Sequence, residues 1–187
     1  MNIFYLSEDP KECAEMHLDK HVVKMIIEYA QLLSTAHRVI DGAETTELSS
    51  TGRRIKRWNL PDERESSLYK ACHMNHPSAK WTRAGATHYE WLYKLFCALC
   101  DEYTYRYGKV HMTDQKLRQA LAKVPDKIDR SKLFEAPWRA MPDDVKIGND
   151  VLLSYRNYYI LNKKSFAKWT LRPIPQWFTD NAHISIS

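Results

Sequence analysis

The sequence DPKECAEMHLDKHVVKMIIEYAQLLSTAHRVI, residues 9–40, decides the fold of this chain because its apolar side chains recur at helical spacing. Asp9 is a good N-cap residue and Pro10 suits the first helical position, so the pattern predicts a helix over 10–40. Its apolar side predicts burial against the core. The residues on that side are Leu18, Val22, Met25, Tyr29, Leu32, Ala36 and Val39.

Beside the apolar side, the same stretch carries four ionisable residues at helical spacing: His17, His21, Lys24 and Glu28. At about 100° per residue they share one narrow face that borders the core. Two imidazoles, an amine and a carboxylate are groups that act as acid, base, nucleophile or ligand. The plainer interpretation is the solvated side of a surface helix.

The composition is that of a globular protein, with 187 residues, 44% hydrophobic and 27% charged residues. This length suits one domain, 1–187. No apolar run approaches the roughly 18 residues that a membrane span needs, so we expect no membrane partner. The N-terminus lacks a secretion signal, which favours a cytoplasmic protein. The four cysteines fit reduced, structural thiols.

A net charge of +5 and an aromatic content of 12% together suit a nucleic-acid partner. Cations neutralise phosphates, while aromatic faces stack on exposed bases. The alternative is that the aromatic residues only fill the core. Two places gather cations with an aromatic residue: an exposed connection after residue 42 and the C-terminal arm. Their candidate nucleic-acid contacts are Arg53, Arg54, Lys56, Arg57 and Trp58, and Lys168 and Trp169.

Further helices are predicted over 63–73, 77–107, about 113–123 and 150–164. Pro77 marks a helix start and Gly108 a helix end. No segment except NIFYL at the start alternates with a period of two. The expected fold is therefore all-α, a single compact helical domain with long loops and an irregular C-terminal arm.

Three kinds of chemistry fit the ionisable face. His17 and His21 at i, i+4 could bind a metal, with a third ligand such as His76. Lys24 could act as a nucleophile while Glu28, at i+4, moves protons and stabilises positive charge. In the third interpretation the face only binds phosphates.

The segment Asn75–His76–Pro77 adds a second candidate element. Pro77 at the first helical position leaves the following backbone N–H groups free, and helix N-termini attract anions. His76 and Asn75 would stand beside such a site. A simple capping turn also explains the motif.

Two of these stretches resemble a known family. Asp19-Lys20-His21 followed by Glu28 is similar to the Asp-Gln-His…Glu signature of the pyrimidine-dimer DNA glycosylases, also called endonuclease V. The Asn75–Pro77 segment leads into a long aromatic helix that closes with Arg106-Tyr107-Gly108, which resembles the ending found in relatives.

The resemblance implies a small helical repair enzyme that flips a nucleotide, attacks the sugar with an amine, forms a Schiff base and nicks by β-elimination. It implies that Glu28 is the catalytic glutamate and His21 the histidine of the signature. The family's nucleophile is the α-amine of a small second residue, but Asn2 stands here. An arginine precedes the family's glutamate, where this chain has Ile27. Lys24 or Lys20 is then the substitute amine.

The sequence thus predicts a base-excision DNA glycosylase and AP lyase acting on damaged or modified pyrimidines in double-stranded DNA. The expected catalytic residues are Glu28, Lys24, His21 and His76, with Asn75, Lys20 and the two basic clusters on the DNA. No cofactor is expected. The alternatives are a non-catalytic nucleic-acid-binding protein and a metal-dependent hydrolase or nucleotide-modifying enzyme that uses His17 and His21.

Overall fold

The computed structural model describes residues 1–181, and it is mostly helical with one small two-stranded sheet. The expectation of a mostly helical fold is confirmed, and the small sheet means that the fold is not purely all-α. The elements are α1 (Pro10–Met16), α2 (Asp19–Asp41), β1 (Ala43–Leu48), β2 (Arg54–Asn59), α3 (Arg64–Ser67), α4 (Pro77–Thr82), α5 (Ala86–Tyr107), α6 (Met112–Leu117), the 3₁₀ turns η1 (Asp143–Val145) and η2 (Lys164–Phe166), α7 (Val151–Asn162) and α8 (Gln176–Thr179).

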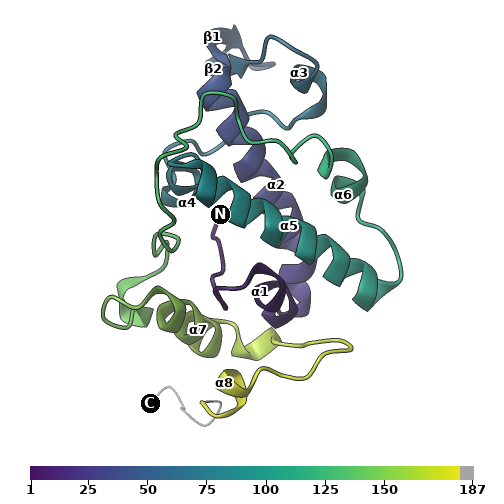
Figure 1. Cartoon of the computed structure of the whole chain (residues 1–187), viewed down its shortest axis with the longest axis vertical. Helices are drawn as coiled ribbons and strands as arrows, with labels where there is room; N and C mark the ends of the chain where they lie inside the picture. Colours follow the sequence, from purple (N-terminus) through teal and green to yellow (C-terminus); the bar gives the residue numbers. More distant parts are fainter. Residues whose placement is uncertain (182–187) are drawn as a thin grey trace.

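The two long helices α2 and α5 form the centre of the molecule, and α1 packs on α5 beside them (Figure 1). Their inner faces are apolar and fully buried, with Leu32 and Leu33 from α2 against Leu92, Leu95 and Phe96 from α5. This burial is the main stabilising contribution to the fold. Within residues 1–181, no helix is both long and apolar enough to cross a membrane.

The helix predicted over 10–40 is broken into α1 and α2 at His17 and Leu18, both in extended conformation. Asp9 caps α1 as expected, by accepting a hydrogen bond from the Glu12 N–H at 2.9 Å. The break has no local cause in the sequence. Leu18 is fully buried and the His17 ring is held inside the core, so tertiary packing sets the bend.

The helix predicted over 77–107 is also broken, into α4 and α5. Gly85 lies between them, and a Cβ atom there would come within 2.7 Å of the Lys132 side chain. The loop that contains Lys132 therefore packs so closely on position 85 that only a residue without a Cβ atom fits there. The predicted end of α5 is confirmed, because Gly108 adopts the left-handed conformation with φ of 66° and terminates the helix.

The helix predicted over 63–73 is reduced to the single turn α3. The guanidinium of Arg38, on α2, is fully buried. It donates hydrogen bonds to the backbone carbonyls of Glu65, Leu68 and Tyr69 at 2.6–3.0 Å. These carbonyls bond to Arg38, and the chain leaves the helix at Leu68. The predicted helix over 113–123 likewise stops at Leu117, in α6.

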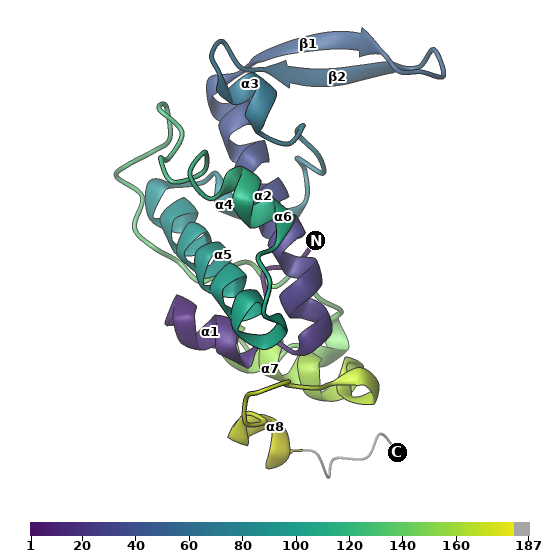
Figure 2. The same ribbon diagram turned by 90° about the vertical axis from the view of Figure 1, so that its right-hand side faces the viewer.

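The connection after α2 is a β-hairpin, where the sequence suggested an exposed loop. β1 and β2 pair antiparallel in the register Ala43 with Asn59 through Leu48 with Arg54. Gly52, with φ of 74°, lies in the turn, and the Ser49 N–H donates to the Arg53 carbonyl at 2.8 Å. Figure 2 shows the hairpin projecting sideways from the end of α2.

The C-terminal part packs across one end of the molecule. α7 confirms the helix predicted over 150–164 and begins after Asp150, which caps it by accepting from the Leu153 N–H. It lies beside η1, η2 and α8 (Figure 1). The segment after η2 is irregular, as the sequence suggested, and it joins the first turn of α2 through the hydrogen bond from the Asp19 N–H to the Lys168 carbonyl at 2.8 Å.

Candidate active site around Glu28

The carboxylate of Glu28 lies between two amines. Lys24 Nζ is 3.2 Å from Glu28 Oε1, one turn earlier on α2. The α-amino nitrogen of Met1 is 3.9 Å from Glu28 Oε2. The Glu28 side chain is 15% exposed, whereas that of Lys24 is 69% exposed and that of Met1 only 6%. The site therefore holds a mostly buried carboxylate, one amine on an exposed side chain, and the α-amine of a residue whose side chain is buried.

The N-terminal segment brings the Met1 amine to this position. Ile3, Phe4, Tyr5 and Leu6 are all buried, so the chain start is drawn into the molecule, and the N-terminus lies near the middle of the view (Figure 1). The Met1 carbonyl accepts from Ser78 Oγ, on α4, at 3.3 Å.

Hydrogen bonds from three helices fix the same segment further along. The Phe4 N–H donates to Tyr29 Oη at 3.2 Å, and the Phe4 carbonyl accepts from Cys13 Sγ at 3.1 Å. Arg156, on α7, donates from Nε and Nη2 to the Leu6 carbonyl at 3.0 and 2.8 Å. Burial raises the pKa of the Cys13 thiol to about 12, so the thiol keeps its proton as a donor. The chain segment that carries the Met1 amine is therefore fixed by hydrogen bonds that lie away from Glu28.

His76 stands at the same site, as the N-cap of α4. Its Nδ1 accepts from the Ser78 N–H at 3.1 Å, so a neutral ring carries its proton on Nε2. The pKa of His76 is lowered, first by burial and then by the positive charges of the N-terminal amine and His73, while Glu28 opposes the shift. This supports the capping interpretation of the motif and leaves an N–H donor near Glu28. Asn75, just before it, is exposed.

His73 also belongs to this region, and it has a backbone φ of 47°, in the left-handed conformation that non-glycine residues seldom adopt. Sequence reasoning did not single out His73, Ser78 or the position of the Met1 amine. His73 and Ser78 lie at the ends of predicted helices, where the apolar pattern says nothing of their contacts. The resemblance pointed to an N-terminal amine, and the apolar run at Ile3–Leu6 was a signal that the chain start is buried.

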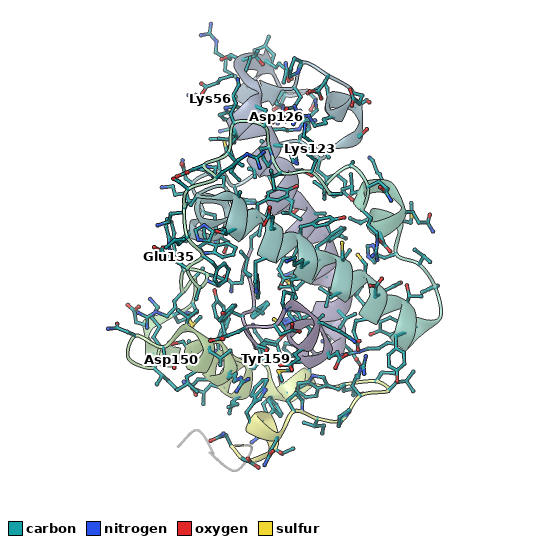
Figure 3. The ribbon with its side chains drawn as sticks, in the orientation of Figure 1. Lys56, Lys123, Asp126, Glu135, Asp150 and Tyr159 are labelled. Carbon is teal, nitrogen blue, oxygen red and sulfur yellow. The ribbon has the colours of Figure 1, made fainter. Side chains whose placement is uncertain are left out.

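His21 of α2 and His17, just before it, both lie inside the core, which corrects their expected place on an open face. His21 is 7% exposed; its ring stacks on Phe4 at 4.2 Å between centroids, and its Nδ1 is 2.6 Å from Tyr159 Oη. Burial lowers its pKa to about 2. Figure 3 shows Tyr159 within the lower half of the molecule, on α7. His21 therefore packs the core and is closed to a substrate.

His17 is fully buried and uses both ring nitrogens. Nδ1 lies 2.7 Å from the Cys13 carbonyl and Nε2 2.9 Å from Tyr29 Oη. Burial lowers the pKa of His17 to about 4, so the ring is neutral. Neither nitrogen is free for a metal. In the described part of the chain, residues 1–181, no three His, Cys, Asp or Glu side chains are grouped as metal ligands.

The predicted nucleic-acid contacts divide into exposed and buried residues. Lys20 is exposed with its Nζ 4.5 Å from the Phe166 ring centre, and Lys168 is exposed. Trp169 corrects the expectation: it is 7% exposed, donates from Nε1 to the Met16 carbonyl at 2.9 Å and packs on Phe178. Trp169 therefore cannot stack on a base.

The hairpin carries the remaining predicted contacts. Arg53, Arg54 and Lys56 are exposed, and Arg57 and Trp58 are half-buried. Figure 3 shows Lys56 at the end of the molecule opposite Tyr159. These residues are thus separated from Glu28 by the C-terminal part of α2.

The stretches that resemble the glycosylase family meet in space. Arg106 Nη1 lies 2.9 Å from Asp19 Oδ1, and Tyr107 Oη donates to the Asp19 carbonyl at 3.4 Å. Arg106 is also paired with Glu102 at 2.6 Å. These contacts tie the start of α2 to the end of α5.

A cleft of about 430 Å³ lies away from Glu28, between α1 and α5. Its walls include Lys11, Glu15, Lys94, Glu102 and Arg172. Arg172 already bridges Glu15 at 3.3 Å and Glu102 at 2.8 Å, so the charges of this cleft are largely satisfied within the chain.

Comparison with known proteins identifies no relative: no family model, no curated protein and no solved structure matches this chain. What the site can do is therefore argued from its groups. An amine held beside a carboxylate, with an imidazole N–H nearby, is suited to nucleophilic attack on an electrophilic carbon with proton transfer.

Proposed function

We propose that this chain is a DNA N-glycosylase with AP lyase activity that acts on damaged or modified pyrimidine nucleotides, with Glu28 as its catalytic carboxylate. The observation that supports this most is the position of Glu28 between the Met1 α-amine and Lys24 Nζ. The contact of Asp19 with Arg106 and Tyr107, which joins the two family-like stretches, is in keeping with it.

The reaction starts with attack of an unprotonated amine on C1′ of the nucleotide. The N–C1′ bond forms, and the glycosidic bond breaks with its electron pair leaving on the base. Glu28 accepts the proton that the attacking amine loses, and the His76 Nε2–H can donate to the departing base. Glu28 returns its proton to O4′ as the C1′–O4′ bond breaks, which opens the ring and gives the Schiff base. Glu28 then takes a C2′ proton while the C3′–O bond breaks with its electron pair on the phosphate oxygen, and water hydrolyses the Schiff base to release the amine.

The Met1 α-amine is the better candidate for the nucleophile. The Met1 side chain is nearly buried and the Met1 carbonyl accepts from Ser78, which restrains the α-amine, whereas Lys24 is exposed and must lose side-chain freedom to attack. A reacting atom already held in place avoids part of that entropic cost. Lys24 then pairs with Glu28 and faces a phosphate.

Lys20, Lys24 and Lys168 are exposed cations near the N-terminal half of α2. Such residues neutralise phosphates without reading sequence. Extrusion of the target nucleotide from the duplex would bring C1′ to an amine that the stacked duplex keeps out of reach.

The proposal is tested by borohydride trapping on duplex DNA with a single abasic site. We expect a covalent adduct with the wild-type chain and with Lys24→Ala, and none with a form whose N-terminal amine is blocked. Lys94→Ala, at an exposed position of α5, is the matched control for the lysine change. An adduct that vanishes with Lys24→Ala and survives the blocked N-terminus would assign the attack to Lys24.

A second test is Glu28→Gln, which keeps the shape of the side chain and removes proton transfer. We expect turnover on modified DNA to fall by about 10²–10⁴-fold, the usual contribution of a general acid or base, with little change in DNA affinity. Glu90→Gln, at an exposed position of α5, should leave both unchanged. Full activity of Glu28→Gln would refute the catalytic role of Glu28.

The alternatives make different predictions in the same experiments. A non-catalytic nucleic-acid-binding protein would give no adduct and salt-sensitive binding that Glu28→Gln does not change. The metal-dependent alternative has lost its basis, since His17 and His21 are both engaged inside the core.

A further inference from the structure

The β-hairpin over 43–59 is held at its base and otherwise stands clear of the core. Arg38 Nη1 donates to the Trp58 carbonyl at 3.0 Å, and Gly42 closes α2 where a Cβ atom would come within 3.1 Å of the Asn59 carbonyl oxygen. Beyond this base, five of the six β1 residues are exposed, and Leu48 near the turn is 71% exposed.

A hairpin of this kind contributes little to the stability of the fold. An isolated two-stranded hairpin is at best marginally stable, and this one buries few apolar side chains. Its strands also leave unpaired edges, which proteins usually cover or charge. Its shape and its charges therefore suggest a surface for binding a partner.

Some charged side chains of the hairpin form ion pairs within the chain and others do not. It carries four cations and two carboxylates, Glu44 and Glu47. Lys56 pairs with Glu44 at 2.7 Å and Arg57 with Glu47 at 3.6 Å, but such exposed pairs contribute little and exchange readily. Neither Arg53 nor Arg54 has an acidic partner among residues 1–181.

The register sorts these cations by face. Since side chains alternate along a strand, Arg54, Lys56 and Trp58 share one face of β2, and Arg57 lies on the other. The first face thus presents two cations and an aromatic ring in a row, with Arg53 at the turn. In the antiparallel register Glu44 and Leu48 lie on this face too, opposite Trp58 and Arg54, and Glu44 pairs with Lys56. The two arginines without an acidic partner in the described residues keep the net charge of this face positive, which suits a phosphate backbone.

The hairpin lies on the same side of the molecule as the N-terminal amine (Figure 2). The part of α2 from Glu28 to Asp41 spans about 20 Å, and each strand extends about 20 Å sideways from its end. The tip is then roughly 25–30 Å from Glu28, which corresponds to roughly seven to nine base pairs of duplex DNA. The B-DNA major groove, about 12 Å wide, admits a two-stranded ribbon.

From this geometry we infer that the hairpin is a second DNA-binding element: it docks in the major groove of the duplex beside the target nucleotide, somewhat less than one helical turn away, with Arg53, Arg54 and Lys56 on the phosphates. The inference rests on the proposed function in one respect, that the nucleotide handled at Glu28 belongs to duplex DNA. The inference predicts that the affinity of the protein for DNA depends on the length of the duplex.

The test compares two triple variants of the full chain by fluorescence anisotropy on unmodified duplexes, a readout that needs no catalysis. One is Arg53→Ala/Arg54→Ala/Lys56→Ala. The matched control, Lys11→Ala/Lys94→Ala/Lys109→Ala, makes the same charge change at exposed positions of α1, of α5 and after its end. Circular dichroism melting checks that both variants remain folded.

On a duplex of about 30 base pairs, the hairpin variant should bind roughly 10- to 100-fold more weakly than the control, and its slope of log K against log salt should be smaller by about 2–3, near 0.9 per lost phosphate contact. On a duplex stem of about 5 base pairs, clearly shorter than the separation of the two elements, the two variants should bind alike. Equal binding of the two variants on the long duplex would overturn the inference.

Other outcomes separate this inference from the proposed function. Hairpin-dependent, length-dependent binding without a borohydride adduct would sustain the hairpin assignment and refute the lyase. An adduct with no effect of the hairpin variant would do the reverse. A larger loss on duplex RNA than on duplex DNA would overturn the assignment to a major groove, since the RNA major groove is too narrow for a ribbon.

Discussion

Removing one oxygen atom, in Tyr29→Phe, should destabilise the fold and loosen the N-terminal amine. Tyr29 Oη accepts from the Phe4 N–H at 3.2 Å and lies 2.9 Å from His17 Nε2. The Cys13 carbonyl can only accept, so His17 Nδ1 carries the proton of the neutral ring, and Tyr29 must donate to Nε2. All these groups are buried.

The magnitude follows from the two groups that lose their partner. Each buried donor or acceptor left unsatisfied costs about 1–3 kcal/mol, and the phenylalanine ring leaves no cavity beyond the missing oxygen. We therefore expect a loss of about 2–6 kcal/mol in the free energy of unfolding, a large part of the usual 5–15 kcal/mol. For a chain of this size that lowers the melting temperature by roughly 4–24 °C.

The assay is urea unfolding monitored by circular dichroism, with an unchanged m-value as the check that only stability has moved. Tyr105→Phe is the matched control, because Tyr105 Oη makes one exposed hydrogen bond, to the Leu171 carbonyl at 3.3 Å. It should stay within about 0.5 kcal/mol of the wild type. If Tyr29→Phe also stays within that range, the hydrogen-bond relay does not hold the N-terminal segment as argued.

Two further predictions concern stability. Arg38→Met should lower the free energy of unfolding by about 3–5 kcal/mol in urea titrations, since it strips the buried carbonyls and Glu65 of their donor; a loss below about 1 kcal/mol would contradict this. Acidification should also destabilise the chain: burial lowers the folded-state pKa of His17 and His37 to about 4 and of His21 to about 2, below the unfolded value of 6.5. The unfolded state then binds more protons, so stability is complete above about pH 6.5 and declines below it, and an equal melting temperature at about pH 7.5 and pH 5 would contradict this.

The helix ends were predictable because their signals are local. Asp9 and Asp150 cap helices through their own side chains, and Pro77 and Gly108 begin and end helices as their backbone chemistry requires. The interior breaks were not predictable in this way. His17 and Leu18 have ordinary helix propensities, and only their burial against distant residues explains the bend.

The hairpin was missed because the sequence signals of its ends, Gly42 and Gly52, also fit an irregular loop. Its pairing is completed by Arg38, which holds the Trp58 carbonyl from twenty residues away. The same guanidinium also ends α3, since it takes the carbonyls of Glu65 and Leu68. One buried cation thus changes two neighbouring segments, and no local pattern can reveal it.

The candidate site likewise has some contacts that the sequence predicts and others that it does not. The contact of Lys24 with Glu28 follows from their i, i+4 spacing and could be predicted. The approach of Met1 to Glu28 depends on contacts of Phe4 with Tyr29 and of Leu6 with Arg156, separated by 25 and 150 residues. The burial of His21 depends on Tyr159, equally remote in sequence. Helical spacing therefore predicts which residues share one face of α2, but it does not predict which distant residues pack against that face.

The orientation of Glu28 is consequently set at both ends of α2 rather than at the site. At the start, Asp19 is fixed by Arg106 and by the Thr170 N–H at 2.9 Å. Near the end, Arg38 is fixed by the carbonyls around α3. Because a helix turns as a rigid rod over this length, a rotation that moved Glu28 away from Met1 would have to break both sets of bonds. Substitutions at Asp19 or Arg38 should therefore change the chemistry at Glu28 through the distance between carboxylate and amine, although neither residue touches the site.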